Sequence, residues 1–257
     1  MRLFAIVALI ALIVGGAWLL EQPKSEAPLD QNMSTPLLSP RKVSFLTSDN
    51  VTIVGRYYPL KEFDEAILLL HMMPEKKESW DALAKKLQEN NIVTLAIDLR
   101  GHGESIKKGD KTLDYKLFSD KEHQESQRDV EAALEWLQKE TNLDLTSIYI
   151  GGASIGANLS LQALAVHPEI AKGFLLSPGF NYRGIKTNVL VKKLSKDQEV
   201  FFATSKDDGD NVSQTQELYN ATSAQKQWKV YDNAGHGTTM LEKTNDLLPS
   251  IIQFLVK

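Results

Sequence analysis

The segment that decides the fold is Ile148-Tyr149-Ile150-Gly151-Gly152-Ala153-Ser154-Ile155-Gly156, which the helical pattern Ala157–Ala165 follows. A β-type run thus leads through a glycine-rich turn into a helix. A serine at such a tight turn adopts strained backbone geometry, and its neighbours must be small to avoid clashes. The turn lifts the Ser154 hydroxyl above the sheet and points the free N–H groups of the helix at any negative charge beside it. This arrangement predicts that Ser154 is a nucleophile.

Phosphate binding is the competing use of a glycine-rich turn at the start of a helix. Gly151 and Gly156 have the spacing of the glycines in a P-loop, but Ala157 stands where the lysine must be. The chain also contains no G-x-G-x-x-G motif. The segment therefore favours chemistry at Ser154 over nucleotide binding, and a helix start without chemistry is the remaining alternative.

Alternating strand and helix patterns on both sides of this segment predict the fold class. Helical periodicity is present at Trp80–Leu87, Val130–Leu137 and Leu247–Leu255. The first two β-type runs have no helix between them, and Asp49-Asn50 at their junction predicts an antiparallel hairpin. We therefore predict an α/β fold with a doubly wound, mostly parallel eight-stranded sheet and helices on both faces. The predicted strands are Lys42–Thr47, Val51–Tyr58, Ala66–Leu70, Val93–Ile97, Ser147–Ile150, Gly173–Leu176, Val200–Ala203 and Trp228–Tyr231.

The N-terminal residues differ in composition from the rest of the chain. Leu3–Leu20 is an 18-residue stretch without a charge. As a helix it would cover about 27 Å, close to the hydrocarbon core of a bilayer. We predict residues 1–20 as a signal-anchor or, with Gly15-Gly16-Ala17 as the cleavage site, as a signal peptide. Arg2 before the stretch and Glu21 after it place the bulk of the chain outside the cytoplasm.

The predicted domain organisation follows from this division. Residues 21–40 contain four of the nine prolines among polar residues, which predicts an extended tether. Residues 41–257 then form one folded domain. We expect a membrane-anchored protein with this domain in the periplasm or at the cell surface, or a secreted protein if the N-terminus is cleaved.

The composition excludes several kinds of chemistry. The chain has no cysteine, which rules out a disulfide scaffold, a thiolate metal site and a cysteine nucleophile. Its formal net charge is −4, from 29 Lys and Arg against 33 Asp and Glu. Nucleic-acid binding needs clustered positive charge, so we expect no nucleic-acid partner.

A serine hydroxyl is a weak nucleophile unless a base and an acid assist it. His236 lies in Ala234-Gly235-His236-Gly237, just after the last predicted strand, where catalytic groups gather in open α/β sheets. We predict His236 as the base. The loop after the seventh predicted strand lacks carboxylates at the first and last positions of a calcium loop, so no metal site is expected. It offers three candidates for the acid, which the pattern does not separate: Asp207, Asp208 and Asp210.

The remaining histidines have less specific surroundings. His123 lies in a polar helical stretch and is predicted to be solvated, whereas His167, before a proline, marks a helix terminus. His71 ends the third predicted strand, and His102 lies in the loop after the fourth. Each of these two is either structural or part of the site.

An oxyanion that forms beside Ser154 needs two backbone N–H donors. The first is the N–H of Ile155, at the start of the helix. The second should follow the strand that ends at Leu70, which makes Met72 and Met73 the candidates.

These residues together give the chain a specific resemblance. Over roughly residues 42–257 it is similar to the α/β-hydrolase family, through His71, the segment Asp98–Ser105, the Ser154 turn, the acidic loop and the His236 loop, in that order. The chain order Ser…Asp…His is the order of the family. Matching Ser205-Lys206-Asp207-Asp208 to the family's Gly-x-x-Asp implies that Asp208 is the acid, with Asp207 as the alternative. Met72 departs from the family, which usually has a small residue or glycine there.

The resemblance implies a serine hydrolase that works through an acyl-enzyme and needs no cofactor. Only Ser177–Asp197, 21 residues, separate the sixth and seventh predicted strands, so we expect a minimal lid and small carboxylic esters or thioesters as substrates. A peptidase or amidase with the same residues is the alternative among enzymes. A catalytically silent hydrolase fold that serves as a binding module is the alternative outside them. The oligomeric state stays open.

Overall fold

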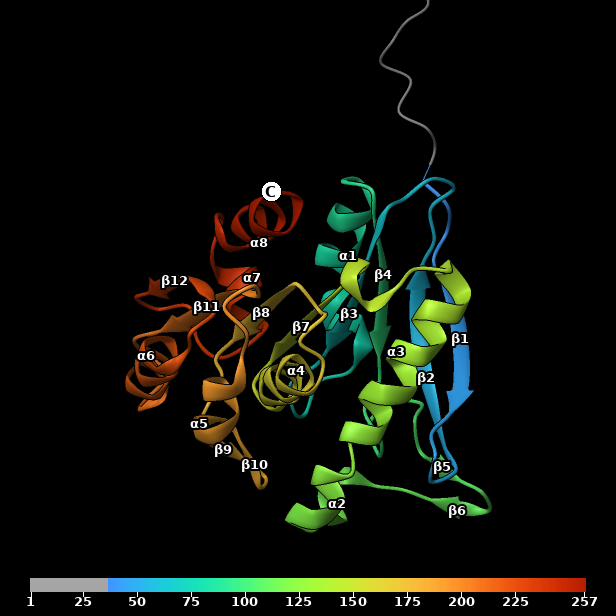
Figure 1. Cartoon of the computed structure of the whole chain (residues 1–257). Helices are drawn as coiled ribbons and strands as arrows, with labels where there is room; N and C mark the ends of the chain where they lie inside the picture. The colour runs from blue at the N-terminus through green and yellow to red at the C-terminus, as the bar shows by residue number, and fades with distance from the viewer. Residues whose placement is uncertain (1–36) are drawn as a thin grey trace, which may run out of the picture. The chain divides into compact units, whose positions relative to one another are not determined.

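A computed structural model describes residues 37–257 of the chain (Figure 1). The predicted apolar segment 1–20 lies outside the described residues, as do residues 21–36 of the predicted tether. The first strand of the described residues, β1, begins at Arg41. Among the described residues, no helix combines the length and apolar character that a membrane crossing requires.

Within residues 37–257, ten strands form one sheet in the order β12-β11-β8-β7-β3-β4-β2-β5-β6, with β1 paired to β2. Neighbours from β12 to β4 run parallel, and the strands beyond β4 are antiparallel. The predicted doubly wound, mostly parallel α/β class is therefore confirmed. The strands of this sheet are β1 (Arg41–Leu46), β2 (Val51–Tyr58), β3 (Glu65–Leu70), β4 (Ile92–Ile97), β5 (Lys107–Lys108), β6 (Lys111–Thr112), β7 (Ile148–Ala153), β8 (Lys172–Leu176), β11 (Glu199–Ser205) and β12 (Gln225–Tyr231).

The predicted count of eight strands is wrong, because the sheet also contains β5 and β6. Each has only two residues, and they form a hairpin that pairs with the start of β2 through Lys108 opposite Val51. A two-residue charged strand is too short to show periodicity, so it depends on pairing with a neighbouring strand. The predicted hairpin of β1 and β2 is present, and its turn contains Asn50 at φ 67°.

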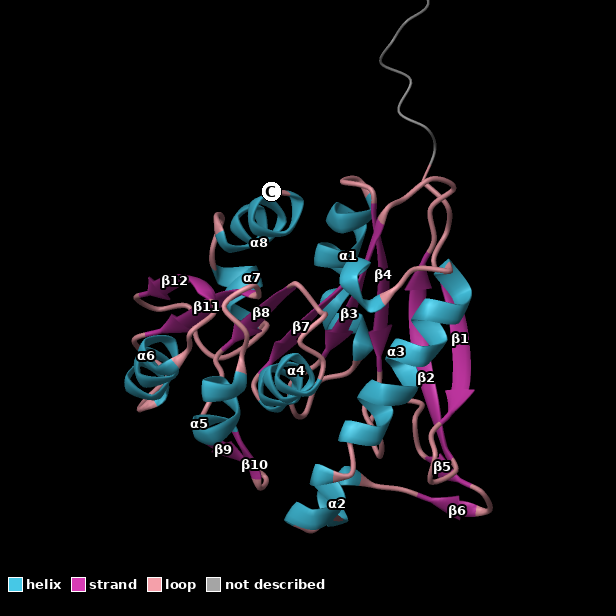
Figure 2. Ribbon diagram, in the orientation of Figure 1, coloured by secondary structure: helices cyan, strands magenta, loops and turns pink. Residues whose placement is uncertain are grey.

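Helices cover both faces of the sheet (Figure 2). Successive residues of β3 point to opposite faces, so Leu68 and Leu70 pack in one apolar cluster with α3 and α4, and Ile67 and Leu69 pack in another with α1 and α8. The helices are α1 (Asp81–Gln88), α2 (Asp120–Gln124), α3 (Gln127–Thr141), α4 (Ile155–Val166), α5 (Thr187–Leu190), α6 (Asn211–Ala221), α7 (Thr239–Lys243) and α8 (Leu247–Val256), with the 3₁₀ turns η1 (Lys77–Trp80), η2 (Tyr115–Leu117), η3 (Leu145–Ser147) and η4 (Val191–Lys193).

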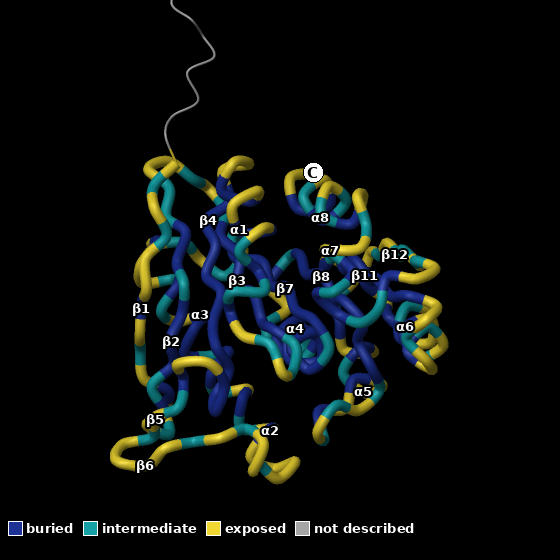
Figure 3. Tube along the Cα trace, turned by 180° about the vertical axis from the view of Figure 1, so that it is seen from behind, coloured by how far each residue is buried: buried dark blue, intermediate teal, exposed yellow. Residues whose placement is uncertain are grey.

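The middle of the sheet is the most buried part of the described chain (Figure 3). Every residue of β4, β7 and β8 is buried, whereas β12 at the edge is half-exposed. Ser154, which directly follows β7, is therefore attached to a rigid part of the sheet.

The segment between β8 and β11 is short, in keeping with the predicted minimal lid. It contains a separate two-stranded hairpin of β9 (Asn181–Tyr182) and β10 (Ile185–Lys186), followed by α5 and η4. This hairpin holds the one aromatic side chain of the segment that reaches the candidate site, Tyr182, as described below.

Candidate active site

The turn at Ser154 has the strained geometry that the sequence predicts. Ser154 has φ 54° and ψ −118°, and its N–H donates to the Leu176 carbonyl of β8 (2.9 Å). A Cβ added at Gly152 would lie 2.2 Å from the Gly156 carbonyl oxygen, and one added at Gly156 would lie 2.2 Å from the Leu70 carbonyl oxygen. Only glycine therefore fits at these two positions, and the close packing presents Ser154 at the carboxyl edge of β7.

His236 and Asp208 are in direct contact at the same edge of the sheet. The His236 Nδ1 and Asp208 Oδ2 atoms are 2.7 Å apart, and the side chains are 34% and 16% exposed. A carboxylate can only accept, so the proton of the neutral imidazole is on Nδ1, and Nε2 carries the free lone pair. Asp208 follows β11 and His236 follows β12, neighbouring parallel strands that end side by side.

The His236 loop also lies against the Ser154 turn. Gly237 donates its N–H to the Ser177 hydroxyl (3.0 Å), and a Cβ placed at Gly237 would lie 3.3 Å from the Cβ of Ala153. Among the described residues, however, the Ser154 hydroxyl makes no hydrogen bond to His236, and the Tyr182 hydroxyl lies near it. Catalytic hydrogen bonds are often loose before substrate binds, so the serine can turn to the imidazole when a substrate enters the site.

The other two carboxylates of the acidic loop do not contact His236. Asp207 is exposed and accepts hydrogen bonds from the Ser205 hydroxyl and from the N–H of Gly235 (3.1 Å). These two bonds hold the pKa of Asp207 below its usual value, the Ser205 bond more strongly. Asp207 therefore links the two loops that carry Asp208 and His236. Asp210 is exposed and precedes α6 without capping it.

His71 is a structural residue of the loop after β3. It is fully buried, and its Nε2 accepts the backbone N–H of Leu99 (3.0 Å), so Nδ1 is protonated and donates to the Met72 carbonyl (2.8 Å). Burial lowers its pKa to about 4, which keeps the ring neutral. Both nitrogens are thus used to hold the backbone on which the candidate oxyanion donor Met72 lies.

Two of the three candidate oxyanion donors, the N–H groups of Ile155 and Met72, remain free to bind a ligand. Among the described residues, neither the Met72 N–H nor the Ile155 N–H donates to a protein acceptor. The Met72 side chain, which replaces the family's small residue, lies over Gly237: a Cβ there would be 2.5 Å from the Met72 sulfur. Gly237 therefore makes room for the larger residue. Met73 follows in the same loop and is half-buried.

Two further histidines are buried away from this chemistry. His102 stacks on Tyr115 with ring centroids 3.8 Å apart, and burial lowers its pKa to about 3. The prediction that His123 is solvated is wrong: it is 2% exposed and packs edge-on against Phe118. Because α2 is composed mostly of polar residues, its sequence gives no sign that His123 is buried against Phe118. His167 caps the end of α4, as predicted.

Tyr182 is the site residue that the sequence does not reveal. It is half-buried on the lid hairpin, edge-on to His236 with ring centroids 6.2 Å apart, and its hydroxyl lies near that of Ser154. Burial, aided by the charge of Asp208, raises its pKa to about 12. The only signal available in the sequence is an aromatic residue within the short lid, which by itself specifies no contact.

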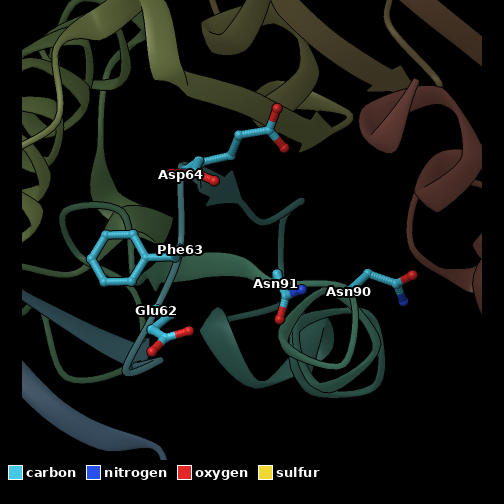
Figure 4. Close-up of a pocket in the computed structure, with 6 residues that line it drawn as sticks. Glu62, Phe63, Asp64, Asn90 and Asn91 are labelled. Carbon is cyan, nitrogen blue, oxygen red and sulfur yellow. The ribbon is translucent and has the colours of Figure 1, made fainter.

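Figure 4 shows a separate hollow that is not lined by any of these residues. It is lined by residues that precede or begin β3 and by residues between α1 and β4, at the amino ends of these strands, whereas Ser154 follows a carboxyl end. Within residues 37–257, no group of three His, Asp or Glu side chains is arranged to hold a metal ion. The lining residues are Glu62, Phe63, Asp64, Glu65, Asn90 and Asn91.

Comparison with known proteins supports the fold. The family model for the alpha/beta hydrolase fold matches residues 65–196. A polyketide transferase of Gibberella fujikuroi is 31% identical over 134 residues, which is 51% of this chain. The match covers only 39% of that protein.

Solved structures share the fold at low sequence identity. An alpha/beta hydrolase from Penicillium superposes with a TM-score of 0.69 at 15% identity, over 85% of this chain and 98% of the other. An esterase from Pyrococcus furiosus superposes with a TM-score of 0.67 at 17% identity, over 84% of this chain and 92% of the other.

Proposed function

Because this chain belongs to the alpha/beta hydrolase fold family, we propose that it is a serine hydrolase that cleaves small carboxylic esters or thioesters through an acyl-enzyme. The observation that carries the proposal is the contact of His236 Nδ1 with Asp208 Oδ2 at the sheet edge where the Ser154 turn lies. The fold of the Ser154 turn does not require a hydrogen-bonded histidine and aspartate beside it, so the pair points to a chemical role.

Each residue has a separate role in the proposed reaction. Ser154 Oγ attacks the carbonyl carbon while His236 Nε2 takes its proton. Asp208 holds the proton on Nδ1 and stabilises the imidazolium that forms. The N–H groups of Ile155 and of Met72 or Met73 bind the oxyanion. His236 then protonates the leaving group, and water, activated by His236 in turn, releases the acid from Ser154.

The lid bears on the size of the substrate, and one relative bears on the acceptor of the acyl group. The lid of one hairpin, α5 and η4 is too small to enclose a long acyl chain, which favours small substrates. The similarity to a polyketide transferase supports a second candidate, acyl transfer from the same acyl-enzyme to an acceptor other than water. The two functions differ only in what attacks the acyl-enzyme.

A covalent probe tests the proposal. We expect a fluorophosphonate to label the wild-type protein at Ser154, located by peptide mass spectrometry, and short-chain p-nitrophenyl esters to be hydrolysed faster than aminoacyl amides. Preference for the amides would favour the peptidase alternative. Absence of both labelling and turnover in the folded protein would favour the catalytically silent module. Product formation that rises when alcohols or amines are added would support acyl transfer.

We also propose that residues 1–20 anchor the protein in a membrane with residues 41–257 outside the cytoplasm, on the basis of the 18-residue uncharged stretch. We expect the full-length protein to sediment with membranes and a variant lacking residues 1–22 to be soluble with unchanged kcat/KM. A full-length protein with an intact N-terminus in the soluble fraction would contradict the anchor. A shortened N-terminus there would identify a cleaved signal peptide.

A further inference from the structure

The hydroxyl of Tyr182 is held by a buried amide that fixes its direction. Asn211, 6% exposed, donates from Nδ2 to the Pro178 carbonyl (2.8 Å) and to the Tyr182 hydroxyl oxygen (3.2 Å). Its Oδ1 accepts from the buried Thr204 hydroxyl (2.5 Å). Because a carbonyl can only accept, the Pro178 contact fixes which end of the amide faces Tyr182.

This contact leaves the proton of Tyr182 for another acceptor. An amide NH₂ cannot accept a hydrogen bond, so the Tyr182 oxygen is the acceptor toward Asn211, and its own O–H points elsewhere. The Tyr182 O–H donates a long hydrogen bond to the Ser177 carbonyl oxygen (3.3 Å), and the Ser154 hydroxyl also lies near the Tyr182 hydroxyl. Since burial raises the pKa of Tyr182 to about 12, the hydroxyl keeps this proton at neutral pH.

The sheet order places Tyr182 on one particular side of the nucleophile. Ser154 follows β7; the candidate oxyanion loop with Met72 follows β3 on one side, and the lid hairpin with Tyr182 follows β8 on the other. Asp208 and His236 follow β11 and β12, farther out on the side of β8. An ester on Ser154 with its carbonyl oxygen toward Met72 and Ile155 therefore has its leaving group toward His236, where Tyr182 also lies.

We propose that Tyr182 is a further catalytic residue, whose O–H donates a hydrogen bond to the leaving-group oxygen as the tetrahedral intermediate collapses. This inference rests on the proposed serine-hydrolase function. The bond between the carbonyl carbon and the leaving oxygen breaks, its electron pair goes to that oxygen, and the proton on His236 Nε2 is transferred to it. Tyr182 stabilises the developing charge and keeps its own proton.

The leaving group decides how much this hydrogen bond matters. A p-nitrophenolate leaving group is stabilised by delocalisation of its negative charge, so it gains little from a hydrogen-bond donor. An alkoxide leaving group has no such delocalisation and depends on hydrogen bonds and protonation. For Tyr182→Phe, which keeps the ring, we expect kcat/KM to fall about 10- to 100-fold with an ethyl ester and less than about 3-fold with the p-nitrophenyl ester of the same acid. The parameter kcat/KM reports the steps through acylation, which include departure of the leaving group.

A matched control separates this role from a structural one. Tyr219 lies on α6, packs against Phe202 and Trp228, and is outside the site, so Tyr219→Phe should leave both esters unaffected. The rate of fluorophosphonate labelling of Tyr182→Phe should match the wild type, because Ser154, His236 and Asp208 remain.

Each other outcome has a definite meaning. Equal loss on both esters, or slowed labelling, would show that Tyr182 only supports the lid or orients Ser154 and would overturn the proposal. Unchanged turnover of the ethyl ester would overturn it as well. Failure of the wild type to label and to hydrolyse either ester would instead overturn the proposed function.

Discussion

Replacing Ser154 by alanine should abolish ester hydrolysis and fluorophosphonate labelling together. The hydroxyl is the proposed nucleophile, and without it no acyl-enzyme forms. We expect kcat to fall by about 10⁵- to 10⁶-fold, with a residual rate from the oxyanion donors and substrate binding alone. Turnover of a short p-nitrophenyl ester and labelling measured on the same preparation test this directly.

The fold should survive this change. Ser154 already has a Cβ at φ 54°, so alanine adds no backbone strain, and the change removes only one hydroxyl group. Thermal unfolding should therefore be nearly unchanged. Ser213→Ala, at an exposed serine of α6, is the control and should retain full activity. Labelling of Ser154→Ala at the wild-type level would contradict the assignment of the nucleophile.

The architecture was predictable because its signals are local. A continuous apolar run such as Ile92–Ile97 suits a strand buried on both faces, and the glycines around Ser154 are demanded by close backbone packing. The helices of both faces show their apolar periodicity directly. The apolar runs, their periodicity and the close approach of Gly152 to Gly156 all involve residues near one another in the sequence.

Other features depend on contacts between distant segments. The strands β5 and β6 exist through pairing with β2, and His123 is buried by Phe118 rather than by its own polar helix. Tyr182 gains its significance from Asn211 and Ser154, which lie 29 and 28 positions away in the chain. No pattern near Tyr182 encodes these contacts, because the fold creates them.

The acidic loop combines both situations. The turn after β11 contains three acidic residues, Asp207, Asp208 and Asp210. Side chains at neighbouring positions of a turn point in different directions, so only one of the three can face His236. In the structure the turn is closed by the Asp208 N–H bond to the Ser205 carbonyl (3.1 Å), with Gly209 at φ 52°. Asp208 then faces His236, while Asp207 faces the backbone of Gly235. The resemblance of Ser205-Lys206-Asp207-Asp208 to the family's Gly-x-x-Asp implies the same carboxylate.

Asp208→Asn should therefore be far more damaging than Asp207→Asn. At position 208 an amide can donate a hydrogen bond to Nδ1 of His236, which favours the tautomer with the proton on Nε2. In that tautomer Nε2 has no free lone pair, so it cannot accept the proton of Ser154. We expect kcat to fall by about 10³- to 10⁴-fold, with little change in KM, because substrate contacts remain. Steady-state kinetics on one ester for both variants provide the comparison.

Asp207→Asn is a matched control, because it makes the same chemical change one residue away. The asparagine oxygen can still accept from the Gly235 N–H and the Ser205 hydroxyl, so the link between the two loops weakens without breaking. We expect less than about a 10-fold loss in kcat and a small decrease in Tm. If Asp207→Asn were instead the more damaging variant, the proton-holding carboxylate would be Asp207, and the loop would have to rearrange in solution to bring it to His236.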